Sequence, residues 1–217
     1  MIKDSIEKKY MGESWKQEKH QAYKTDQIDK SVEDFCKFLE SKKITGSLLD
    51  LGCGNGKNTI FFQKHGFNSI GVDFAKSAIV ICNNNAQYKK IIPKFDVANI
   101  LNYKSRKKFD IIIDCGCLHH IRRKYWTQYN MTILNNLKVE GYFYIHGISD
   151  SDANKKLSKH PKKRNWIINK KRHYTTFFSY NDIKKLLGKN FRIEKHYEFK
   201  SQNSPLTIRA FYIKRLR

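Results

Sequence analysis

The stretch Leu48-Leu49-Asp50-Leu51-Gly52-Cys53-Gly54-Asn55-Gly56 is an apolar run that enters a glycine-rich turn. Val72-Asp73 ends the next apolar run along the chain. Glycine has no Cβ, so alternating glycines let the backbone turn tightly and approach a ligand. An acidic residue at the end of the second strand can accept both hydroxyls of a ribose. The pair predicts a nucleotide-like cofactor held at the first turn of an α/β sheet.

The glycine spacing narrows the choice of cofactor. A dinucleotide-binding turn reads G-x-G-x-x-G and binds a pyrophosphate at a helix N-terminus. This turn reads G-x-G-x-G, with Asp50 two residues before its first glycine. A carboxylate there suits a cation rather than a phosphate, which disfavours a nicotinamide dehydrogenase. An acidic strand end followed by G-x-G-x-G resembles the first motif of the class I S-adenosylmethionine (SAM) dependent methyltransferases, whose cofactor carries a sulfonium and an ammonium.

Three later motifs extend the resemblance, in order, over residues 30–217. Phe95-Asp96-Val97 looks like the family's adenine-side motif, and Phe109–His120 is similar to its fourth motif. Gly141–Ile145 looks like the fifth strand, entered through a glycine turn. The chain lacks both the Asn-Pro-Pro-aromatic motif of amino-methylating nucleic-acid enzymes and a cysteine pair placed like that of cytosine-C5 enzymes. Those two branches are disfavoured, and the chain resembles the small-molecule branch of the family.

The resemblance implies roles for individual residues around the cofactor. Backbone atoms of the turn would approach the methionine part and the ribose; these residues are Gly52, Cys53 and Gly54, with Asp50 nearby. Asp73 would hold the ribose hydroxyls, and Phe74 would meet the adenine face. Asp96 and Val97 would bind the adenine edge. The Cys115 carbonyl would bind the SAM ammonium.

The order of apolar runs predicts an α/β fold with a seven-stranded, doubly wound, Rossmann-like methyltransferase sheet. The sheet is expected to be mostly parallel, with a C-terminal hairpin that adds one antiparallel strand. The expected strands are 47–52, 68–73, 91–96, 109–115, 141–148, 191–199 and 206–214. Helices are expected near 56–65, 76–87 and 122–137, and Ser179 is a plausible N-cap for a helix that stops at Gly188.

Two segments are expected to border the acceptor. Residues 1–43 form an N-terminal helical cap or lid before the methyltransferase domain of residues 44–217; a stripe of apolar residues from Val32 to Leu39 packs on the sheet. The alternative for its first part is a frayed polar terminus. A basic insertion at 151–176, with no acid after Asp152, lies on the substrate side or is a solvated loop. Aromatic and histidine side chains in these two segments are the expected acceptor contacts: Tyr10, Trp15, Trp166, His173 and Tyr174.

Methyl transfer mainly requires alignment of acceptor, methyl carbon and sulfur. A base is needed only where the acceptor must lose a proton. His119 and His120 follow the fourth strand and are the candidate bases, because imidazole titrates in the useful range; structural packing is the alternative. His146, at the end of the fifth strand, is a weaker substrate-side candidate.

Length and composition set the remaining expectations. The 217 residues fit one α/β domain. There is no apolar stretch as long as a membrane span and the start of the chain is polar, so a cytoplasmic protein is expected. Five scattered cysteines indicate free thiols, and no metal site is expected. The net charge of +23 points to a polyanion, or else reflects a genome biased toward Lys, Asn, Ile and Tyr codons.

The leading hypothesis is a SAM-dependent methyltransferase that acts on an oxygen or nitrogen atom of a small, anionic molecule. The first alternative is an RNA methyltransferase of the same fold, which the charge favours. A SAM-binding regulatory protein without turnover is the second. The sequence leaves the oligomeric state open.

Overall fold

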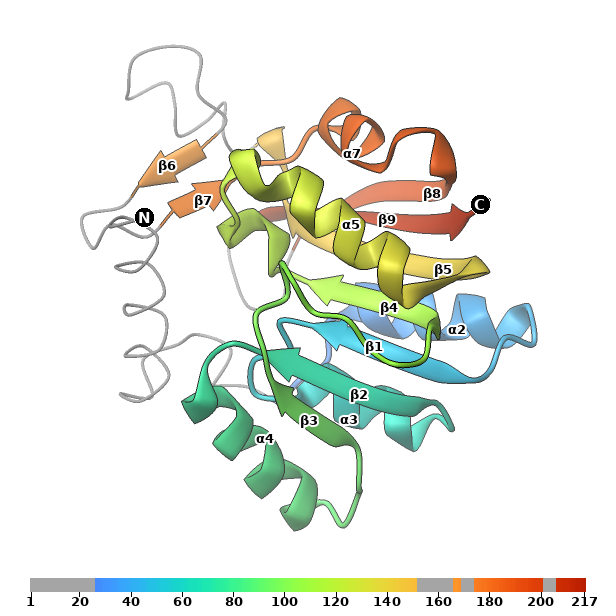
Figure 1. Cartoon of the computed structure of the whole chain (residues 1–217), viewed down its shortest axis with the longest axis vertical. Helices are drawn as coiled ribbons and strands as arrows, with labels where there is room; N and C mark the ends of the chain where they lie inside the picture. The colour runs from blue at the N-terminus through green and yellow to red at the C-terminus, as the bar shows by residue number, and fades with distance from the viewer. Residues whose placement is uncertain (1–25, 152–165, 169–173, 201–205) are drawn as a thin grey trace.

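The computed structural model of the chain describes residues 26–151, 166–168, 174–200 and 206–217. Its centre is a seven-stranded sheet in the order β3-β2-β1-β4-β5-β9-β8 (Figure 1). The strands are β1 (Ser47–Leu51), β2 (Asn68–Asp73), β3 (Lys94–Val97), β4 (Phe109–Cys115), β5 (Leu137–Ile148), β8 (Phe191–Lys200) and β9 (Thr207–Arg215). Strands β1 to β5 pair in parallel, and β9 is antiparallel to both β5 and β8. The predicted fold class is confirmed.

The helices cover both faces of this sheet. Their bounds are α2 (Lys30–Ser41), α3 (Lys57–Lys64), α4 (Lys76–Tyr88), α5 (Trp126–Asn136) and α7 (Tyr180–Leu187). Helices α5 and α7 lie on one face, and α2 and α3 lie on the other (Figure 1). Helix α4 packs on β2 and β3 beside α3. A separate two-stranded sheet pairs β6 (Trp166–Ile168) with β7 (Tyr174–Thr176), inside the segment predicted as a basic insertion.

Side-chain alternation along the strands builds two apolar layers. On the α5 face Ile112 lies beside Phe143, which in turn pairs with Ile213. On the α2 face Tyr144 pairs with Tyr212, and Phe35 of α2 stacks on Tyr144 with ring centroids 4.8 Å apart. Because both faces are buried, the central strands are mainly apolar, apart from carboxylates such as Asp50 and Asp114.

The start of α7 follows the sequence prediction. Ser179 Oγ accepts a hydrogen bond from the Asp182 N–H, and the Asp182 carboxylate accepts one from the Ser179 N–H, each at 3.0 Å. This reciprocal pair is a capping box. The helix ends at Gly188, whose φ is 61°.

Several predicted boundaries shift. Strand β3 begins at Lys94 rather than residue 91, because Pro93 has no N–H to donate to the ladder. A short 3-10 turn, η3 (Arg123–Tyr125), precedes α5. Strand β5 begins at Leu137 rather than at 141, and its pairing with β4 is interrupted near Glu140, whose φ is 63°.

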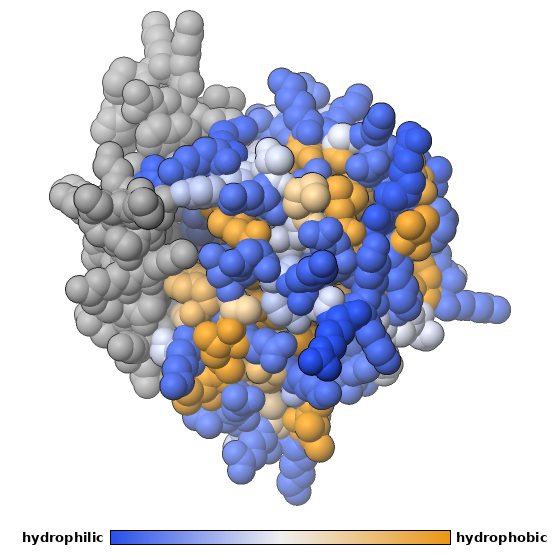
Figure 2. All heavy atoms as spheres, viewed as in Figure 1, coloured by the Kyte–Doolittle hydropathy of each residue, from blue (hydrophilic) through white to orange (hydrophobic). Residues whose placement is uncertain are grey.

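Polar groups dominate the described part of the face that Figure 2 shows. Figure 2 shows hydrophilic residues over much of the described part of the viewed face, with smaller apolar groups between them. No helix among the described residues combines the length and apolarity needed to cross a bilayer.

Candidate active site

The carboxyl ends of β1, β2, β3 and β4 meet at one edge of the sheet (Figure 1). The glycine turn leaves β1 there: Gly52 and Gly54 have φ of 72° and 57°, a region that L side chains rarely adopt. The N–H groups of Gly52 and Cys53 both donate to the Val72 carbonyl, at 2.7 and 3.1 Å. A Cβ on Gly52 would lie only 2.5 Å from Cys117 Sγ. The turn therefore requires glycine for both its conformation and its packing.

Asp73 ends β2 beside this turn. Its Oδ2 accepts a hydrogen bond from the Gly54 N–H at 3.1 Å, and its Oδ1 accepts one from the Ala75 N–H at 2.9 Å. Burial raises the pKa of Asp73, and these backbone bonds oppose the rise. Each carboxylate oxygen keeps capacity for a further donor. Asp73 thus fixes the turn and can still accept ribose hydroxyls.

Three carboxylates gather at the strand ends: Asp50, Asp73 and Asp114, which are 1%, 6% and 0% exposed. Burial raises the pKa of Asp50 to about 7, against the lowering effect of a 2.7 Å bond from Thr59 Oγ1; the charges of Asp114 and Asp73 raise it further. Burial also raises the pKa of Asp114 to about 6. Within the described residues, none of the ion pairs involves these three groups. Buried carboxylates that make no ion pair with the described part of the chain suit a positively charged ligand.

Asp114 also shapes the loop after β4. Its carboxylate accepts hydrogen bonds from the N–H of Cys117 at 2.7 Å and of Leu118 at 3.0 Å. Tyr129 Oη, on α5, donates to it at 2.6 Å. This buried carboxylate therefore ties α5 to the loop that carries the two candidate histidines.

The edge predicted to meet adenine is partly apolar and open. Phe74 is 38% exposed and Val97 is 53% exposed, at the ends of the neighbouring strands β2 and β3. Asp96 is exposed, and its Oδ2 accepts a 3.4 Å hydrogen bond from Tyr103 Oη. Apolar side chains left open beside a carboxylate fit a flat heterocycle that bears an amine.

His119 and His120 lie on the turn η2 (Leu118–His120), directly after the β4 loop. Their rings meet edge to face with centroids 4.0 Å apart. The His119 ring lies close to Gly116, where an added Cβ would be 3.1 Å from His119 Cε1. His120 Nδ1 lies 3.3 Å from the Tyr174 carbonyl oxygen. The structure thus brings the histidines together, and it brings one of them to the end of the basic segment.

Tyr174 is buried rather than open to solvent. Its hydroxyl accepts a 2.7 Å hydrogen bond from Thr176 Oγ1, and Arg122 lies over its ring at 5.2 Å. The predicted substrate-side residue therefore forms part of the wall beside His120.

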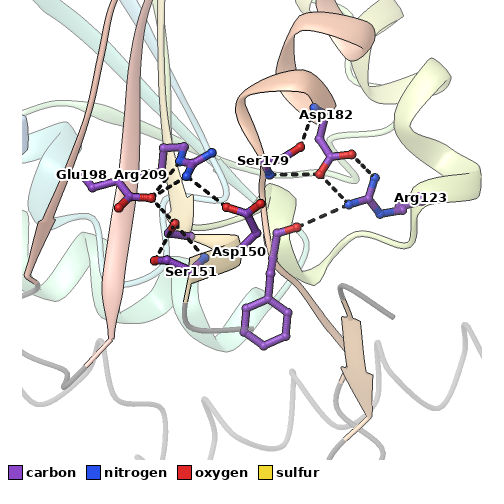
Figure 3. A network of polar contacts seen from close by, with 9 residues as sticks. Arg123, Asp150, Ser151, Ser179, Asp182, Glu198 and Arg209 are labelled. Atoms are coloured by element: carbon purple, nitrogen blue, oxygen red, sulfur yellow. Dashed lines mark hydrogen bonds and ion pairs between the residues drawn. The ribbon is translucent and has the colours of Figure 1, made fainter. Parts of the chain in front are cut away.

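A polar network fixes the two ends of the basic segment (Figure 3). Arg123 binds both oxygens of Asp182, at 2.7 and 2.9 Å, and donates to the Phe177 carbonyl at 3.3 Å. Arg209 bridges Asp150 at 3.0 Å and Glu198 at 2.5 Å (Figure 3). Charge-assisted contacts of this kind hold the chain on both sides of the segment against the end of the sheet.

His146 lies on the face of β5 that α2 covers. It is buried; its Nδ1 is 3.0 Å from Tyr144 Oη and 3.4 Å from Ser31 Oγ. Burial lowers the pKa of His146 to about 4, so the ring is neutral near pH 7 and a weak base. Cys115, whose carbonyl was predicted to meet the SAM ammonium, pairs with His146 across the β4–β5 ladder and is partly exposed.

Four predicted side chains lie outside the described residues: Tyr10, Trp15, His173 and the side chain of Trp166. Sequence reasoning did not assign Asp114, Tyr129, Thr59 or Cys117 to the site. The available signal for Asp114 was a carboxylate near the carboxyl end of β4, directly after three apolar residues. Tyr129 reaches Asp114 from α5, and Thr59 reaches Asp50 from α3, so no local pattern marks these two partners.

Fold and site together define an α/β protein with a glycine turn and a buried acidic cluster suited to a cationic nucleoside cofactor. A family profile described as "Methyltransferase domain" matches residues 42–193. The chain is 27% identical over 154 residues to 2-heptyl-1-hydroxyquinolin-4(1H)-one methyltransferase of Mycobacteroides abscessus, a match that spans 70% of this chain and 66% of that protein. It is 30% identical over 131 residues to human EEF1A lysine methyltransferase 2, spanning 54% of each protein.

Solved structures share the fold. A Burkholderia thailandensis 1,6-didemethyltoxoflavin-N1-methyltransferase with bound 1,6-didemethyltoxoflavin and S-adenosylhomocysteine superposes with a TM-score of 0.78, at 16% identity, over 99% of this chain and 89% of that one. A SAM-dependent methyltransferase from Clostridium acetobutylicum superposes with a TM-score of 0.70 at 17% identity, over 86% of this chain and 91% of that one. The chain belongs to the class I SAM-dependent methyltransferases. SAM is accordingly its cofactor.

Proposed function

We propose that this protein transfers a methyl group from SAM to an oxygen or nitrogen atom of a small molecule. The observation that carries the proposal is the buried acidic cluster of Asp50, Asp73 and Asp114 beside the glycine turn and a partly exposed pair of histidines. Two similar proteins support a small-molecule acceptor. The Mycobacteroides abscessus enzyme is named for a hydroxylated heterocycle, and the Burkholderia thailandensis structure contains a bound heterocycle.

The chain's own residues would bind and orient the cofactor. Asp73 would accept the ribose hydroxyls, and Phe74 and Val97 would cover the adenine. Asp50 and Asp114 would provide negative potential for the cationic end, and the backbone carbonyl of the partly exposed Cys115 would accept a hydrogen bond from the ammonium. Bound SAM supplies a methyl group already activated by its sulfonium, so most of the protein's work is alignment.

A proton must leave the acceptor when that acceptor is a hydroxyl or a protonated amine. His119 and His120 are the groups placed to accept it, since both are partly exposed after β4. His146 is not proposed as the base, because burial against α2 lowers its pKa to about 4.

The acceptor is proposed to be anionic. Residues 151–176 are rich in Lys and Arg, and Arg122 lies over Tyr174 where this segment returns to the site. Residues 1–43 would form the cap on the same side, with α2 as its base against the sheet. The free cysteines of the described residues are in keeping with a cytoplasmic location, which we also propose.

The deciding experiment incubates the full chain with methyl-tritiated SAM and a cell extract separated into small-molecule, RNA and protein fractions. Label should enter the small-molecule fraction, and an anion-exchange step should retain the labelled product. Label in RNA alone, with affinity that falls linearly with the logarithm of salt concentration, would establish the RNA alternative instead.

Two further outcomes would contradict the proposal. Label in the protein fraction alone would place the chain functionally with the human lysine methyltransferase relative. SAM binding measured by calorimetry, without transfer to any fraction, would indicate a regulatory SAM-binding protein.

A further inference from the structure

A second group of reactive side chains lies away from the cofactor site, where α2 packs beside the end of α3. It consists of Cys36, Glu40 and His65, whose ligand atoms all lie within 4.8 Å of one another. Cys36 Sγ is 3.5 Å from Glu40 Oε1, and His65 Nδ1 is 3.1 Å from the same oxygen. We call these three residues the α2–α3 cluster.

Two elements bring the cluster together. Cys36 and Glu40 are four residues apart on α2, so both project from one face of the helix. His65 is the C-cap of α3, and its ring packs on Phe61 with centroids 4.4 Å apart. The ring is therefore held by a contact within its own helix as well as by Glu40 of α2.

The spacing of the donors matches a tetrahedral ion. Zinc bonds of about 2.3 Å to sulfur and about 2.0 Å to nitrogen or oxygen place sulfur and oxygen about 3.5 Å apart and nitrogen and oxygen about 3.3 Å apart. The observed distances are 3.5 and 3.1 Å. Two of the three edges already have the required length, and the Cys36–His65 edge, at no more than 4.8 Å, closes with a small side-chain rotation.

We propose that the α2–α3 cluster binds one Zn²⁺ ion through Cys36 Sγ, Glu40 Oε1 and His65 Nδ1. Thiolate and imidazole donors favour zinc and exclude Mg²⁺ and Ca²⁺, which prefer oxygen. Water would occupy the fourth position, since the side chains of Glu40 and His65 are 51% and 41% exposed. The ion would tie the C-terminal half of α2 to the end of α3.

Zinc binds the thiolate form of cysteine, so the Cys36 thiol must lose its proton when the ion binds. Zinc binding forms an S–Zn bond as the S–H proton leaves to solvent, so binding should release a proton and weaken as the pH falls.

The test is calorimetric titration of the chelator-treated full chain with ZnCl₂ alone. Wild type should bind one Zn²⁺ per α2–α3 cluster, and Glu40→Gln and His65→Gln should each weaken binding by at least about 10- to 100-fold, the loss typical even of residues that only support a ligand. Both side chains are well exposed, so these variants should fold. Glu33→Gln on the same helix and His196→Gln on β8 are matched controls that should keep wild-type affinity.

Cobalt provides an independent readout. Co²⁺ bound to wild type should show a thiolate-to-metal charge-transfer band that Cys36→Ser abolishes. Absence of zinc binding by wild type, or equal affinity in Glu40→Gln, His65→Gln and the controls, would overturn the site and leave the cluster as a hydrogen-bonded network only. Methyl transfer plays no part in these measurements, so their failure would leave the proposed function untouched.

Discussion

The hydroxyl of Tyr129 should stabilise the protein through its bond to the buried carboxylate of Asp114. Both side chains are 0% exposed, and the oxygen atoms are 2.6 Å apart. Tyr129→Phe keeps the ring in its packing and removes only the donor. Because hydrogen bonds to charged groups contribute about 1.5 to 3 kcal/mol, we expect a loss of about 2 kcal/mol in the free energy of unfolding at pH 8. For a domain of this size that corresponds to a Tm lower by about 4 to 8 °C.

The loss should depend on pH. Burial raises the Asp114 pKa from 3.8 to about 6. Folding therefore favours the protonated carboxyl; this contribution to stability is fully present below pH 3.8 and is lost as the pH rises through about 6. Removing the Tyr129 donor raises this pKa further, which widens the difference between variant and wild type over the same interval. At about pH 5 the carboxyl is mostly protonated, and the bond then contributes about 0.5 to 1.5 kcal/mol.

Urea unfolding at both pH values, followed by circular dichroism, measures the two differences. Tyr103→Phe is the matched control, because Tyr103 Oη donates to the exposed Asp96 at a longer 3.4 Å. Its free energy of unfolding should stay near that of wild type. An equal loss for Tyr129→Phe at both pH values, or no loss at either, would refute the argument that the Asp114 charge makes the bond strong.

Three further outcomes are expected. Asp73→Ala should weaken SAM binding by at least about 100-fold in calorimetry, because it would remove two charge-assisted bonds to the ribose and also removes the hydrogen bond that Asp73 accepts from the glycine turn; unchanged affinity would contradict the proposed role of Asp73 as the ribose-binding residue. SAM affinity should rise between about pH 5 and pH 8 as Asp50 and Asp114 ionise, with pKa values of about 7 and about 6, and a flat profile would contradict their role toward the cation. If His119 or His120 is the base, its Asn variant should lose about 10²- to 10⁴-fold in turnover and retain SAM affinity, whereas near-normal turnover in both would leave alignment alone to carry catalysis.

Local sequence was sufficient for the cofactor turn. Gly52 and Gly54 have the positive φ that their spacing predicts, and Asp73 lies beside them because β1 and β2 are parallel neighbours. The N-cap at Ser179 and the antiparallel strand β9 could also be predicted from the sequence. Each of these features depends on residues close in the chain or on the known order of strands in an α/β sheet.

Contacts between elements that are distant in the sequence could not be predicted. The three-residue strands β6 and β7 are too short to give a periodic signal within a basic segment. Side chains alternate along β5, so His146 lies on the same face as Tyr144, against α2. Burial there lowers the His146 pKa and makes the ring a weaker base. Predicting this required knowing which face α2 would cover.

The sequence by itself determined the fold class, the glycine turn and the acidic strand end, because backbone conformation and strand order follow from local patterns. Only the tertiary structure decided which side chains meet. Asp114 contacts Tyr129 of α5, and Cys36 and Glu40 of α2 lie close to His65 at the end of α3. Such meetings arise when helices dock on a sheet, and a pKa follows from the burial that docking creates.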